Sequence, residues 1–70
     1  MSEREWVGPV PEKDDFGYTI GGVFIDGKLQ RGPWAIMTPG NHRLHGVGLG
    51  TGRGQKYKKN PDGKWVKVEG

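Results

Sequence analysis

Between His45 and Gln55, glycine occupies every second position, from Gly46 to Gly54. A period of two is the geometry of an extended strand, because successive residues of a strand point to opposite faces. One face of such a strand is bare backbone, which a second sheet, another chain or a ligand can approach closely. The pattern therefore predicts a glycine-alternating strand over residues 46–54. Its interaction face would consist of Gly46, Gly48, Gly50, Gly52 and Gly54.

Two interpretations of this bare face remain open. The glycines either allow tight packing within the protein's own sheet, or they form a surface on which a partner chain packs, which would include a homo-oligomer. Phosphate-binding loops are excluded, because no glycine is followed by Lys and then Ser or Thr. The dinucleotide-binding fingerprint fails as well, since its closing glycine would fall on Thr51 or Arg53.

The length and composition of the chain predict one small folded domain. Seventy residues bury little surface, and the absence of cysteine excludes both disulfides and thiolate zinc sites. Fourteen glycines and five prolines are typical of loose segments, whereas three tryptophans supply the apolar area of a folded centre. No apolar run is long enough to cross a membrane and no signal pattern opens the chain, so we expect a cytoplasmic protein without membrane contact.

The N-terminal part is interrupted by prolines, and we expect residues 1–15 to be a flexible arm pinned by Trp6 and Val7. Residues 16–70 would form the domain. Asp26-Gly27 is typical of a two-residue hairpin turn, and it would pair residues 22–25 with residues 28–31. Residues 34–37 look like a buried third strand, followed by turn chemistry at 38–41 and a helical turn or loop at 42–45.

The glycine-alternating strand would then continue to Lys59, turn at residues 60–63 and return as residues 64–68. No segment has a sustained helical period. These elements predict an all-β fold: a small antiparallel meander or partly open barrel of four to five short strands, with a loose N-terminal arm.

Charge is distributed unevenly along the chain. Residues 1–40 hold four basic and six acidic residues, a net charge of −2, whereas residues 41–70 hold seven basic and two acidic residues, a net charge of +5. A basic half of this kind attracts anions, including nucleic acid or an acidic protein surface. It is equally typical of a solvated lysine-rich edge that prevents aggregation between strands.

The last hairpin combines basic and aromatic residues. If Asn60 pairs with Lys64 across a bulged turn, Lys59 lies opposite Trp65, and Tyr57 lies opposite Lys67. Sheets use such faces to stack bases and neutralise phosphates, but the same aromatics could instead cap a small core under lysine stems. The predicted nucleic-acid-binding residues are Arg53, Lys56, Tyr57, Lys58, Lys59, Lys64, Trp65 and Lys67.

Catalytic and metal sites have weaker support. His42 and His45 could face one metal ion from a helical turn, with Asp14 or Asp15 as further ligands, but no third ligand stands at a defined spacing. Ser2 is the only serine, and adjacent Asp14 and Asp15 would point apart in an extended chain. We therefore predict no catalytic residues, no metal site, no cofactor and no enzyme.

Two segments, Lys13-Asp14-Asp15-Phe16-Gly17 and Thr38-Pro39-Gly40-Asn41-His42, have the look of two C-x-x-C knuckles at ribbon spacing. In this respect residues 13–42 resemble small zinc-ribbon-like proteins of phages and bacteria. All four ligand positions depart from cysteine, since they hold Lys13, Phe16, Thr38 and Asn41. The resemblance implies a β-rich ribbon without its metal that binds nucleic acid or protein.

Taken together, these patterns predict a non-catalytic binding domain. Its expected partner is an anion, nucleic acid first, bound at the basic and aromatic C-terminal hairpin. The alternative is a protein-interaction or self-assembly module that packs through the glycine-alternating strand.

Overall fold

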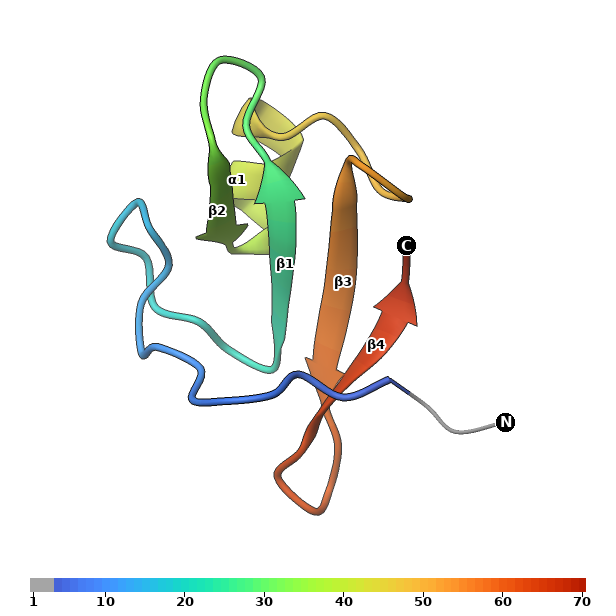
Figure 1. Ribbon diagram of the computed structural model, residues 1–70. Coiled ribbons are helices and arrows are strands. Elements are labelled where there is room, and N and C mark those ends of the chain that lie inside the picture. The colour runs from blue at the N-terminus through green and yellow to red at the C-terminus, as the bar shows by residue number, and fades with distance from the viewer. Residues whose placement is uncertain (1–3) are drawn as a thin grey trace.

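The computed structural model describes residues 4–70 and contains one antiparallel sheet with one short helix (Figure 1). The strands are β1 (Val23–Lys28), β2 (Trp34–Met37), β3 (Gly54–Lys59) and β4 (Trp65–Glu69), and the helix α1 is Pro39–His45. The order across the sheet is β2-β1-β3-β4, and every neighbouring pair is antiparallel. The expected all-β fold of four to five short antiparallel strands is confirmed, with four strands in one open sheet.

Helix α1 replaces the turn expected at residues 38–41 and extends the possible helical turn at 42–45 to seven residues. Pro39 stands in the first turn, where its missing N–H costs nothing. The helix ends at Gly46, whose N–H donates to the carbonyl of His42 at 2.8 Å. A side chain at Gly46 would collide with the ring of His42, so only glycine fits at the position where the chain leaves the helix.

The two faces of the sheet carry two separate clusters of buried side chains. Helix α1 contacts β1 and β2, and it covers the face on which Ile25, Ala35 and Met37 are buried. On the opposite face Phe24 is fully buried, beneath aromatic rings from β3, β4 and the N-terminal segment. Each face of this small sheet is therefore protected by a different part of the chain.

The hairpin turn predicted at Asp26-Gly27 is wrong. Both residues lie inside β1, which continues to Lys28, and the connection to β2 runs through residues 29–33, where the Leu29 N–H donates to the Pro33 carbonyl at 3.1 Å. Residues 28–31 therefore do not pair with residues 22–25. Gly27 serves close packing instead, because an added Cβ would lie 3.2 Å from the end of Met37 and 3.3 Å from the Arg53 carbonyl oxygen.

The glycine-alternating strand is also wrong, since residues 46–53 form a loop and β3 begins only at Gly54. Gly48, Gly50 and Gly52 have φ angles of +101°, +121° and +76°, which an extended strand does not contain and which side chains rarely adopt. Gly54 is needed for a different reason, because its Cβ would approach the Gly48 carbonyl oxygen to 2.9 Å. The loop packs backbone against backbone over the end of β3.

The N-terminal segment contacts both outer strands of the sheet. Along β4, the Trp6 N–H donates to the Trp65 carbonyl at 2.9 Å and the Lys67 N–H donates to the Arg4 carbonyl at 2.8 Å. Along β2, the Asp15 N–H donates to the Ile36 carbonyl at 2.9 Å. Between these points the segment passes one end of the strands (Figure 1). It thereby pairs part of each edge that an open sheet would leave exposed.

Trp6 anchors this segment as expected, because its ring packs on Phe24, whereas Val7 is 91% exposed and anchors nothing. Residues 1–3 of the expected arm lie outside the described residues. The mobility of residues 4–15 and the division into an arm and a domain at residues 15 and 16 stay predictions, which amide exchange would measure.

Candidate nucleic-acid interface

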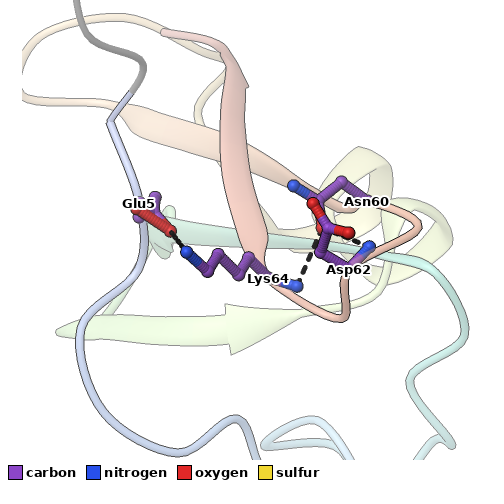
Figure 2. A network of polar contacts seen from close by, with 4 residues as sticks. All are labelled: Glu5, Asn60, Asp62 and Lys64. Carbon is purple, nitrogen blue, oxygen red and sulfur yellow. Dashed lines mark hydrogen bonds and ion pairs between the residues drawn. The ribbon is translucent and has the colours of Figure 1, made fainter.

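The β3–β4 hairpin has the turn and the register that the sequence predicts. The side chain of Asn60 accepts hydrogen bonds from the N–H groups of Asp62 and Lys64 at 3.1 and 2.9 Å, which fixes the turn (Figure 2). Gly63 takes the positive φ of +83° that the turn requires. Asn60 and Lys64 close the hairpin, since the N–H of the first donates to the carbonyl of the second.

This register places two basic and aromatic pairs on one face of the hairpin. Lys59 lies opposite Trp65, and Tyr57 lies opposite Lys67. These four residues, Tyr57, Lys59, Trp65 and Lys67, are called the hairpin face below. Because side chains alternate between faces along a strand, Lys58 and its partner Val66 lie on the reverse side.

The aromatic rings of the hairpin face belong to a larger cluster. Tyr57 stacks on Phe24 with 5.2 Å between ring centroids, and Trp65 tilts against Phe24 at 5.0 Å. Trp6 meets Tyr57 edge-on at 5.4 Å. Tyr57 and Trp65 are therefore half-buried: one side of each packs in the core, and the remainder is accessible. Capping the core and contacting a ligand are compatible roles for rings held in this way.

The other predicted basic residues do not join the hairpin face. Lys56 pairs with Glu69, and Lys64 pairs with Glu5, each at 3.8 Å (Figure 2 shows the second pair). Such exposed pairs contribute little to stability and leave the lysines available to other anions. Arg53 lies in the glycine loop directly before β3, whereas Lys59 is the last residue of that strand, so the two basic residues are at different ends of β3.

A second lysine and tryptophan pair, which sequence reasoning missed, lies on the same side of the sheet as the hairpin face. Lys28 is opposite Trp34 across β1 and β2, and Trp34 is 44% exposed. Asp26 lies between Lys28 and Phe24 on this side. Burial raises the pKa of Asp26, and the negative charge of Asp15 raises it further. The only sequence signal for the pair was alternation within β1, which the wrong turn at Asp26-Gly27 obscured.

The histidines do not converge on a common site. The Nε2 atom of His42 lies 2.8 Å from the Gly48 carbonyl oxygen, to which it donates, and the ring of His45 stacks on Phe16 at 4.6 Å. Within residues 4–70, no three His, Cys, Asp or Glu side chains form a group that could hold a metal ion. That the protein has no catalytic residues and no cofactor stays a prediction.

The Asp14 carboxylate accepts five hydrogen bonds, although the sequence suggested only a metal ligand. Its Oδ1 atom accepts from the N–H groups of Phe16 and Tyr18, both at 2.9 Å. Its Oδ2 atom accepts from the Thr38 N–H and hydroxyl at 2.8 and 2.9 Å and from the Asn41 amide at 2.8 Å. Both carboxylate oxygens are thus committed to structure.

Asp14 also joins the two segments on which the zinc-ribbon resemblance rests. Residues 13–17 and residues 38–42 meet through its carboxylate, which accepts hydrogen bonds from Thr38 and Asn41. The resemblance itself stays a prediction.

No protein-family model matches this chain, and neither does any curated protein or solved structure. The helix of the described residues has seven residues and is too short to cross a membrane.

Proposed function

We propose that the protein binds single-stranded nucleic acid through the hairpin face. The observation that carries the proposal is the register of β3 and β4, which alternates lysine and aromatic side chains on one face. Lysines neutralise phosphates, and accessible aromatic surface stacks unpaired bases. The bases of a duplex are already stacked on each other, whereas the bases of a single strand are free to stack on aromatic side chains. The half-exposed rings of Tyr57 and Trp65 therefore favour a single strand over a duplex.

The charges of the hairpin support this proposal without extending it to every basic residue. Lys59 is exposed and makes no ion pair among the described residues, and Lys67 lies beside Tyr57 on the same face. Asp26 and Asp15 make the other end of the sheet less favourable for phosphate. We therefore confine the site to the β3–β4 end. The alternative module, which packs through a bare glycine strand, loses its geometric basis because that strand is absent.

The test compares two matched variants in binding to a fluorescent oligothymidylate, measured by anisotropy at two salt concentrations. Lys59→Gln with Lys67→Gln removes both lysines of the hairpin face and should weaken binding. It should also reduce the slope of log K against log salt by roughly 1.4, which is about 0.7 per phosphate contact for a single strand. Lys58→Gln with Lys56→Gln removes two lysines from the reverse side and should change the slope less.

Duplex DNA and single-stranded RNA of the same length complete the experiment. Wild-type protein that binds no oligonucleotide at low salt would refute the proposal. Equal effects of the two double variants would show a general charge effect without a site. Circular dichroism checks that both variants fold.

A further inference from the structure

A second exposed surface, on the opposite side of the molecule from the proposed interface, has a different composition. It is formed by the 16–18 turn, the β1–β2 loop and the last turn of α1. Its members are Phe16, Tyr18, Arg31, Arg43, Leu44 and His45, and we call it the α1 patch. Tyr18 is 61% exposed and Leu44 is 67% exposed, and nothing in residues 4–70 covers them.

The α1 patch contains two hollows. One has a volume of about 200 Å³ and is lined by Phe16, Leu29, Gln30, Arg31 and His45. The other has a volume of about 300 Å³ and is lined by residues that include Tyr18, Arg43 and Leu44. Each hollow thus combines apolar surface with one arginine, and both are bounded by the 16–18 turn and by α1. Each has room for side chains of a partner.

The structure holds the walls of these hollows rigidly. The Phe16 and His45 rings are parallel within 18°, with 4.6 Å between centroids. The side chain of Gln30 donates to the Gly46 carbonyl at 3.1 Å, which ties the β1–β2 loop to the end of α1. Asp14 fixes the 16–18 turn through the N–H groups of Phe16 and Tyr18. A surface that is already ordered loses little entropy when it binds.

The charge of the α1 patch favours an acidic partner. Arg31 and Arg43 are exposed and form no ion pair with any of the described residues. The two carboxylates next to the 16–18 turn are engaged elsewhere: Asp14 by its five hydrogen bonds, and Asp15 by the Ile36 N–H at 2.8 Å. A ligand that brings its own carboxylates would find two guanidinium groups whose planar forks match them.

Composition favours a protein over nucleic acid. The α1 patch has arginine, aromatic rings and an exposed leucine but no lysine, and arginine and aromatic residues are enriched in the cores of protein interfaces, where lysine is depleted. The β3–β4 hairpin shows the opposite pattern, with five lysines and no arginine over residues 54–67. Leu44 offers nothing to a phosphate backbone but fits an apolar side chain.

We propose that the α1 patch docks an acidic segment of another protein, in which carboxylates meet Arg31 and Arg43 and apolar side chains enter the two hollows. This binding is independent of the hairpin face, so its success or failure does not depend on the proposed nucleic-acid binding.

The test starts from random linear peptides displayed on phage and selected against the wild-type protein. We expect the enriched peptides to combine Asp or Glu with Leu, Phe or Trp. Binding of a synthesised winner should fall about tenfold or more in Arg43→Glu and in Leu44→Ala, and in a peptide whose carboxylates are replaced by amides. The matched control is Lys58→Glu on the hairpin, which should bind the peptide as the wild type does.

Several outcomes would overturn the proposal. Selection that enriches nothing would do so, and so would selected peptides that bind Arg43→Glu and Leu44→Ala as tightly as they bind wild type. An effect of Arg43→Glu on oligothymidylate affinity without an effect on peptide binding would assign the patch to nucleic acid. A concentration-dependent dimer that Leu44→Ala abolishes would show that the occupant is a second copy of this chain. Thermal unfolding of each variant confirms that it is folded.

Discussion

Replacing Asp14 by Asn tests how far a single carboxylate organises the fold. An asparagine keeps one oxygen for the N–H groups of Phe16 and Tyr18, but its amide nitrogen faces the donors of Thr38 and Asn41. Each buried donor left without an acceptor costs about 1–3 kcal/mol, and the remaining bonds lose the strength that the charge gave them.

We therefore expect Asp14→Asn to lower the free energy of unfolding by about 2–4 kcal/mol. A domain of this length has about 4–10 kcal/mol in total, so the variant should still fold at 25 °C. Urea unfolding followed by tryptophan fluorescence measures the change. The matched control is Asp15→Asn, since Asp15 is exposed and its carboxylate accepts one bond, from Ile36; it should cost less than about 1 kcal/mol.

The pH dependence of the unfolding free energy provides a second test of the role of Asp14. Burial alone would raise the pKa of Asp14, but hydrogen bonds from Asn41, Thr38 and Tyr18 outweigh it and hold the pKa well below its usual range. The unfolded chain then binds the proton more tightly than the folded one. The stabilisation is complete above about pH 5 and is lost as the pH falls below about 4 toward the folded pKa.

The difference between wild type and Asp14→Asn should therefore shrink as the pH falls from 5 toward 2. The reasoning would be refuted if the difference in unfolding free energy stayed constant over this range. It would also be refuted if Asp14→Asn and Asp15→Asn unfolded at the same urea concentration.

Three further changes follow from contacts described above. Gly54→Ala should lower the free energy of unfolding by about 1–3 kcal/mol, because its Cβ would meet the Gly48 carbonyl oxygen at 2.9 Å. Trp6→Ala should lower it by about 2–3 kcal/mol, less than for a fully buried tryptophan, while Val7→Ala should have no effect. Asp26→Asn should raise the stability at pH 7, because a raised pKa means that the folded state disfavours the ionised carboxylate; the gain should vanish below about pH 4, where Asp26 is protonated in both states. Urea unfolding measures all three, and the reasoning fails at any position where the sign is opposite.

The sequence was sufficient where short-range chemistry decides the structure. Asn60-Pro61-Asp62-Gly63 permits few turns, and once the turn is known, counting residues gives the pairing of Lys59 with Trp65 and of Tyr57 with Lys67. The strand Trp34–Met37 was visible as an apolar run between turn residues, but its expected burial holds only for Ala35 and Met37, because Trp34 is 44% exposed.

The sequence was insufficient where a distant segment decides. Asp26-Gly27 has the composition of a hairpin turn, but Gly27 is a glycine because Met37 and the Arg53 carbonyl approach it in the folded state. The alternating glycines satisfy the period of a strand equally well, yet Gly48, Gly50 and Gly52 serve a loop that needs positive φ. The presence of glycine in a sequence does not indicate whether the position requires close packing or a positive φ angle.

The candidate site was predicted only in part, because some of its contacts are local and others involve distant segments of the chain. The hairpin face followed from local register, whereas the support of its rings by Trp6 depends on the pairing of residues 4–6 with β4. Asp14 could not be recognised as a structural centre, because its partners Thr38 and Asn41 are more than twenty residues away in the chain.

The pairing of the N-terminal segment with β4 has a consequence for the kinetics of folding. Arg4 and Lys67 are separated by nearly the whole sequence, so their contact closes a longer loop than any other backbone hydrogen bond within residues 4–70 and bears a larger entropic cost. The β3–β4 hairpin closes through the five residues 60–64 and can form long before this contact. The Trp6 contacts should therefore be absent from the folding transition state, with φ-values near zero. Losing them would leave the folding rate almost unchanged and accelerate unfolding, so the N-terminal segment determines how long the native state lasts once formed.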